Sequence, residues 1–237
     1  MSCKKDLRRL DATGQAKRGS QRQIQFLVNS RQEEFSKQIL GLLSLPPLVE
    51  AKVQWVSPLA EYGFNEYQDA EFLEKLELNQ HSPRLKDFWP PGGPCWDAPG
   101  VVRGINPQGA VLIEAKSHFS EMQSTCRGRG TSRQKIEKSL ALTARSLGVE
   151  MNSSWTDQYY QIANRYAHLY FLREVAEVRA WLVNVYFIND QSIEHVQPPP
   201  RSADEWHEEL RRVRERMGLG TKPVPITADL FMEAVST

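Results

Sequence analysis

The sequence predicts an α/β fold, in which a mixed central β-sheet is flanked by helices. Apolar residues recur at helical spacing in several separate stretches, which is typical of amphipathic helices. Between these stretches lie shorter runs that alternate or are wholly apolar, as in partly or fully buried strands. The resulting order of helix, strands, helix and strand is that of an α/β domain with a mixed sheet.

We expect an N-terminal helical extension, a core and a C-terminal segment. Pro46 and Pro47 end the first unit, because proline cannot continue a helix. Near the other end, Ser202 or Asp204 can cap a helix that stops at Gly218. The three segments are a basic arm and helical extension at 1–48, an α/β core at 49–196, and a linker with a C-terminal helix and tail packing on the core at 197–237.

The individual elements follow from local patterns. Residues 1–20 are expected to form a mobile arm, and 21–43 one broken helix or two short ones. Within the core, the patterns predict a strand at 52–56, a helix at 65–78, a long Pro- and Gly-rich loop at 80–97, a β-hairpin at 100–118, helices at 132–147 and 155–176, and an apolar strand at 180–188.

Composition narrows the class of protein. The 237 residues are 40% apolar and 25% charged, as in soluble globular proteins, and no apolar run is long enough to span a bilayer. Cys3, Cys95 and Cys126 are too few and too scattered for a disulfide framework, so a cytoplasmic setting is expected. A zinc site is not expected, because only His118 lies near a cysteine.

Charge is unevenly distributed although the net charge is only +1. Residues 1–31 and 127–145 are strongly basic, whereas 61–77 is acidic. This segregation is compatible with a polyanionic partner on one face and equally with solvated helix faces.

A Glu-Ala-Lys triplet occurs twice, at 50–52 and at 114–116. The second ends an apolar strand, so Glu114 and Lys116 point to the same side of the sheet. The expected hairpin brings Asp97 next to Glu114. Two carboxylates with a lysine beside them form a plausible oxygen site for Mg²⁺. The alternative is that Glu114 and Lys116 are surface charges of an unrelated α/β domain.

In residues and in order, this arrangement resembles the PD-(D/E)XK nuclease superfamily, with Trp96 standing where the name of the motif has proline. The resemblance covers about residues 52–190 and implies a restriction-endonuclease-like core acting as a Mg²⁺- or Mn²⁺-dependent nuclease on nucleic acid, with DNA favoured. Asp97 and Glu114 would bind the metal with the Ala115 carbonyl, and Lys116 would act on the attacking water. A non-catalytic binding or interaction module of the same fold is the alternative.

The superfamily often adds an acid from the preceding helix. On the expected helix at 65–78, Asp69 lies at the centre of the apolar face and Glu66 on its flank. A carboxylate on a buried face is costly unless it is paired or metal-bound, which makes either residue a candidate. Alternatively, Glu66 complements the helix dipole.

Further candidates for substrate binding lie beyond the triplet. Gln161, Arg165 and His168 form a polar stripe on a helix, and a Gln-centred motif occupies this place in some related nucleases. Gln161 and Arg165 would contact phosphate or the helix acid, or else face solvent, whereas a core histidine is the favoured interpretation of His168. His118 would share the face of Lys116 if the strand continues.

Overall fold

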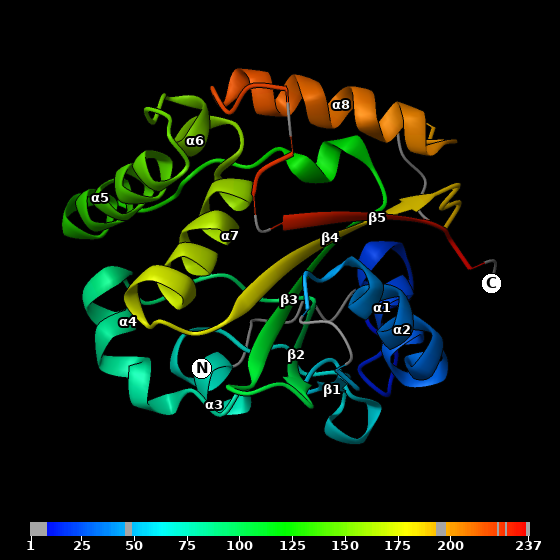
Figure 1. The fold of residues 1–237 in the computed structure, drawn as a ribbon. Helices are drawn as coiled ribbons and strands as arrows, with labels where there is room; N and C mark the ends of the chain where they lie inside the picture. Colours follow the sequence, from blue (N-terminus) through cyan, green and yellow to red (C-terminus); the bar gives the residue numbers. More distant parts are fainter. Residues whose placement is uncertain (1–8, 46–48, 193–197, 222, 226, 236–237) are drawn as a thin grey trace.

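The computed structural model describes residues 9–45, 49–192, 198–221, 223–225 and 227–235. Its centre is a five-stranded sheet with strand order β1-β2-β3-β4-β5 (Figure 1). The first three strands pair antiparallel and the last three parallel, so the α/β class and the mixed sheet are confirmed. The strands are β1 (Lys52–Trp55), β2 (Ala98–Arg103), β3 (Gly109–Lys116), β4 (Ala180–Ile188) and β5 (Thr227–Glu233).

Helices cover both faces of the sheet (Figure 1). The N-terminal pair packs on one face, where its apolar side chains meet those of Val111, Ile113 and Val183. The other helices pack on the opposite face around Leu112 and Leu182. The N-terminal pair is α1 (Gly19–Ser30) and α2 (Gln32–Leu42), and the second layer contains α3 (Asp69–Lys75), α4 (Ser82–Phe88), α5 (Gly130–Ser146), α6 (Ser154–Asp157), α7 (Tyr160–Tyr170) and α8 (Ala203–Arg216).

Strand β3 is buried along its whole length, and its side chains alternate between the two layers. Val111, Ile113 and Ala115 join the core under α1 and α2, because successive residues of a strand point to opposite faces. Glu114 and Lys116 therefore lie on the side of α7. The burial of two charged side chains at the end of an otherwise apolar strand is the feature that marks the site.

The N-terminal region forms two short helices, one of the two expected forms. Residues 9–18 are not a free arm: Leu10 and Ala16 are joined by a β-bridge and both are buried, while residues 1–8 lie outside the described part. The expected helix at 65–78 is shorter, since α3 begins at Asp69.

Two further expectations, one for a loop and one for a long helix, were wrong. The segment 80–97, expected to be a loop, contains α4, which has Pro83 in its first turn, where a missing N–H has no cost. The expected helix at 155–176 is divided into α6, α7 and a π-helical turn at Phe171–Val175.

The C-terminal segment was predicted only in part. Ser202 caps α8, as its side chain accepts a hydrogen bond from the Glu205 N–H at 3.3 Å. The residues after α8 are more than a tail, because β5 adds a parallel edge strand beside β4. Within the described ranges, no helix has the length and apolar character needed to cross a membrane.

Candidate active site

Strand register brings Asp97 and Glu114 together. Ala98 pairs with Ile113 in the antiparallel ladder, so Asp97 stands across from Glu114 one step further along. Asp97 Oδ2 accepts a hydrogen bond from the Ala115 N–H at 2.7 Å. The sheet itself therefore fixes the first carboxylate against the strand that carries the second.

Glu114 is held by two cations. Its Oε1 accepts a hydrogen bond from Lys116 Nζ, and its Oε2 accepts one from Arg165 Nε at 2.5 Å. Arg165 also donates to the carbonyl oxygen of Cys95 at 2.7 Å, and its guanidinium lies 4.9 Å from the ring centre of Trp96. Of the alternatives expected for Arg165, the solvent-facing one is wrong, because this residue of α7 is buried and pairs with Glu114. A contact with phosphate stays a prediction.

The two carboxylates have opposite electrostatic environments. Burial, followed by the negative charge of Glu114, raises the pKa of Asp97 well above its usual range. Burial also acts to raise the pKa of Glu114, but Arg165 and Lys116 outweigh it and the pKa is lowered. Burial acts to lower the pKa of Lys116, yet Glu114 and Asp97 raise it, so the ammonium stays protonated.

A polar row continues from Glu114 across the sheet. Glu114 pairs in register with Asn184 of β4, which pairs with Asp229 of β5. Asn184 Nδ2 donates to Asp229 Oδ1 at 2.9 Å, and Arg214 of α8 lies 3.8 Å from Asp229. Burial raises the pKa of Asp229 despite these partners. Sequence reasoning missed this row, although Asn184 interrupts an otherwise apolar strand.

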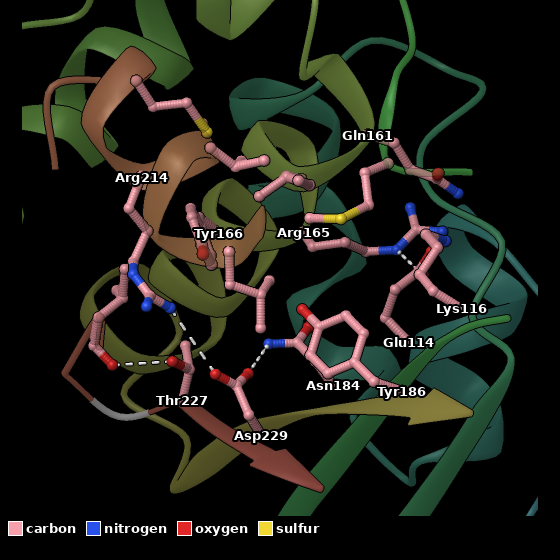
Figure 2. A pocket seen from close by; sticks show the side chains of 16 residues that line it. Glu114, Lys116, Gln161, Arg165, Tyr166, Asn184, Tyr186, Arg214, Thr227 and Asp229 are labelled. Carbon is pink, nitrogen blue, oxygen red and sulfur yellow. Dashed lines mark hydrogen bonds and ion pairs between the residues drawn. The ribbon is translucent and has the colours of Figure 1, made fainter. Parts of the chain in front are cut away.

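A small cavity of about 30 Å³ lies along this row (Figure 2). Figure 2 shows Glu114 and Arg165 toward one end and Asp229 with Arg214 toward the other. A volume of this size holds about one or two water molecules. Gln161 lines the same cavity, so it is brought to the site as expected, and its N–H is held by Ser124 Oγ at 2.7 Å.

The two candidate helix acids occupy different places. The negative charge of Glu66 contributes to the raised pKa of Asp97, so Glu66 lies beside the centre. Asp69 instead accepts hydrogen bonds from the N–H groups of Gly92 and Gly93, at 2.9 and 2.8 Å. The expectation that Asp69 faces the metal centre was wrong, because its carboxylate caps the loop that follows α4.

The two candidate histidines, His118 and His168, are buried. Strand β3 ends at Lys116, so His118 does not continue its face and is instead 3% exposed at the start of a 3-10 turn. The shared strand face expected for His118 is therefore not formed, and a contact of its ring with water or phosphate stays a prediction. His168 is also buried, with Nδ1 2.9 Å from the Asn164 carbonyl oxygen, and packs edge-on against Trp89.

A closed ring of hydrogen bonds fastens the start of α1 to the end of β3, and sequence reasoning missed it. Asp190 accepts from Ser117 Oγ at 2.6 Å and from Ser192 Oγ at 2.5 Å, and Ser192 Oγ accepts from the Gly19 N–H at 2.8 Å. Glu121 completes the ring, because it accepts from the Ser117 N–H at 2.9 Å and from Ser20 Oγ at 2.8 Å. The residue directly after Lys116 is thus fixed to the N-terminal helix.

The oxygen atoms at the centre have the chemistry that Mg²⁺ prefers. Lys116 Nζ lies 3.2 Å from the Ala115 carbonyl oxygen as well as against Glu114, so a cation already stands among these oxygens. In the part of the chain that is described, no three His, Cys, Asp or Glu side chains converge as a ready-made metal cage. Mg²⁺ commonly binds one or two carboxylates together with substrate phosphates, so the donor set fits it.

The first triplet lies elsewhere. Glu50 precedes β1 and Lys52 begins it, and both side chains are exposed. Neither charge is among the main influences on the pKa of Asp97 or of Glu114. Comparisons with family models, with curated proteins and with solved structures found no match to this chain, so the functional interpretation depends on the site itself.

Proposed function

We propose that this protein is a Mg²⁺-dependent nuclease that hydrolyses phosphodiester bonds of nucleic acid, with DNA as the first candidate substrate and Mn²⁺ as an alternative ion. The observation that supports it best is the pairing of Asp97 with Glu114 across β2 and β3, beside the buried ammonium of Lys116. Lys116 is paired with Glu114 and lies within the electrostatic reach of Asp97. A buried charge is costly unless it is paired, and such groups cluster at functional sites.

Each residue has a role in this proposal. Asp97, Glu114 and the Ala115 carbonyl would hold the ion, and Glu66 would orient water near it. When bound, Mg²⁺ supplies charge stabilisation at phosphorus and a more acidic water. Lys116 remains protonated and is suited to offset charge on the phosphoryl oxygens. Gln161, which lines the cavity, would contact substrate.

Ion binding in this site has a cost. Both oxygens of Glu114 already accept hydrogen bonds from Lys116 and Arg165, so a metal ion competes with two cations for the same carboxylate. We therefore expect weak affinity for Mg²⁺ alone and tighter binding when a phosphate adds its own charge. The same two hydrogen bonds to Glu114 favour the second candidate, a non-catalytic binding module of similar fold.

The test is cleavage of plasmid and single-stranded DNA, and of RNA, in a Mg²⁺ series, with thermal unfolding followed in parallel. Wild type should cleave and should be stabilised by Mg²⁺, by an amount set by the Mg²⁺ concentration relative to the dissociation constant. Asp97→Ala should lose both responses. Lys116→Ala should lose cleavage but keep the Mg²⁺ stabilisation, since lysine acts on water and phosphate rather than on the ion.

The chain supplies its own matched control. Lys52→Ala changes the equivalent lysine of the exposed triplet and should leave both responses at the wild-type level. Cleavage by Lys116→Ala at the wild-type rate would refute the proposal. Mg²⁺ stabilisation without cleavage of any substrate would instead support the binding module. A cytoplasmic location belongs to the same proposal, since it rests on the sequence alone.

A further inference from the structure

Two groups of cations near the candidate centre have no carboxylate partner among the residues that the structure describes. Lys17, Arg18 and Arg22 lie at the start of α1, and Arg127 and Arg129 lie in the loop before α5. Arg22 is half-buried and the other four are exposed. None of the five forms an ion pair with any residue that the structure describes.

The first group is placed by two contacts of α1. Gln21 Nε2 donates to Glu66 Oε1 at 2.7 Å, and Glu66 is the acid whose charge acts on Asp97. Ser20 Oγ donates to Glu121, whose charge acts on Lys116. Because these two contacts lie between Arg18 and Arg22 in the chain, the N-terminal helix forms one wall of the centre rather than a separate extension.

The second group is placed on another side by the segment after β3. Ser124 holds the N–H of Gln161, which lines the cavity with Glu114 and Lys116. Arg127 follows three residues later, at most about 10 Å of extended chain away. Its neighbour Cys126 is fixed by a backbone hydrogen bond to Thr156 at 2.7 Å.

The other cations of the basic segment 127–145 are of two kinds. Some already make contacts within the protein, and the others lie further along α5. Arg133 pairs with Glu137 and lies 3.6 Å from Asp157, and Lys135 donates to the Lys86 carbonyl oxygen at 2.8 Å. These two charges stabilise local structure and are not available to a ligand without loss of a contact. Lys138 and Arg145 are exposed further along α5.

We infer that a nucleic-acid strand crosses the carboxyl end of β3 with its phosphates held on one side by Lys17, Arg18 and Arg22 and on the other by Arg127 and Arg129. The inference rests on the proposed function for the identity of the central phosphate. A centre rich in carboxylates repels a polyanion, so binding requires cations close by, and unpaired ones gain most from phosphate contact.

The test is binding without cleavage. A short labelled duplex and a single strand of equal length are titrated with full-length protein in EDTA, by fluorescence anisotropy, over a salt series from about 50 to about 200 mM. The variants are Lys17→Gln/Arg18→Gln/Arg22→Gln and Arg127→Gln/Arg129→Gln. The control, Lys37→Gln/Lys138→Gln/Arg145→Gln, removes three exposed charges from α2 and the outer part of α5.

Loss of phosphate contacts reduces the dependence of log affinity on log salt by about 0.9 per contact on a duplex and about 0.7 on a single strand. The triple variant should therefore lower the slope by about 2 to 3 and the double variant by about 1.5 to 2, with at least about ten-fold weaker binding at low salt. The control should match wild type.

The results separate the two proposals. Equal slopes for wild type and both flanking variants, or an equal loss in the control, would overturn the inference even if the protein cleaves DNA. Binding with the expected slopes in a protein that never cleaves would uphold the strand path and remove the nuclease proposal. Thermal unfolding of each variant shows whether lost binding reflects lost fold, and a folded variant with reduced slope supports the inference.

Discussion

Arg165 Nε of α7 donates a 2.5 Å hydrogen bond to Glu114 Oε2 of β3, and both side chains are almost fully buried. This contact joins the helix layer to the strand that carries the candidate centre. It also decides the charge of the site, because Arg165 is the largest influence that lowers the pKa of Glu114 against the effect of burial. Glu114 is consequently ionised while its neighbour Asp97 resists ionisation.

Removing Arg165 should therefore destabilise the fold. Arg165→Gln leaves Glu114 buried with one cation fewer, and breaking a buried pair by loss of one partner costs about 3–5 kcal/mol. Urea unfolding at neutral pH measures the change. Arg212→Gln removes an exposed pair with Glu208 and should cost less than about 1 kcal/mol. Equal, small losses in the two variants would contradict the buried pairing.

Asp97 should make the metal-free protein less stable as pH rises. Its pKa is raised in the folded state, so the folded form with protonated Asp97 is favoured below the unfolded pKa of about 3.9, and this advantage is lost as pH rises through the folded pKa. Asp97→Asn keeps an oxygen for the Ala115 N–H without the charge. In EDTA it should be more stable than wild type at neutral pH, and the difference should shrink toward pH 4.

Unfolding free energies of wild type and Asp97→Asn, measured across that pH range, check this. Asp157→Asn serves as control, because Asp157 is largely exposed and its charge is not part of the centre. A wild type that gains stability over Asp97→Asn as pH rises would show that Asp97 is not crowded by Glu114.

His168 should produce a separate acid-sensitive transition. Burial is the main cause that lowers its pKa to about 4 in the folded protein, whereas an unfolded histidine titrates near 6.5. Between these values only the unfolded chain binds the proton, so stability falls as pH decreases through this window, by about 3 kcal/mol in total. His168→Gln should flatten the profile there, and replacement of the exposed His207 by Gln should not. An unchanged profile in His168→Gln would place the acid sensitivity elsewhere.

Local sequence patterns were sufficient to predict those elements that a motif of a few residues identifies. The hairpin of β2 and β3 and the apolar β4 were predicted because a turn motif and an apolar run identify them directly. Strand β5 was missed, since its residues are only half-buried at the sheet edge and carry no apolar run. Helix α4 was missed because its neighbouring prolines resemble loop residues, although Pro83 starts the helix.

The residues of the site also fall into those that local spacing identified and those that it did not. Glu114 and Lys116 were identifiable because a two-residue spacing on a strand fixes their common face. Asp69 was misplaced because its helical phase was taken over a longer helix, whereas α3 begins at Asp69 itself, at φ 54°. Asp229, Asp190 and Ser20 reach the centre only through tertiary contacts between distant segments. The periodicity of a short stretch of sequence does not predict contacts between distant segments.

The ring around Asp190 should control how firmly α1 is fastened to β3. Asp190 is 1% exposed and accepts from Ser117 and Ser192, so Asp190→Ala leaves buried donors without an acceptor. Each such loss costs about 1–3 kcal/mol. Amide hydrogen exchange should therefore accelerate at Gly19 and Ser117, by about ten-fold or more, while central β4 amides change only with global stability.

The control is Thr125→Ala, which removes an exposed hydrogen bond to the Asp157 carbonyl and should leave both amides protected. Because Ser117 follows Lys116, loosening the ring should also increase mobility of the lysine without altering its charge. In a cleaving protein this would lower kcat more than it raises KM. If Gly19 and Ser117 remain as protected in Asp190→Ala as in wild type, α1 is held by its apolar face alone and the ring contributes nothing to the site.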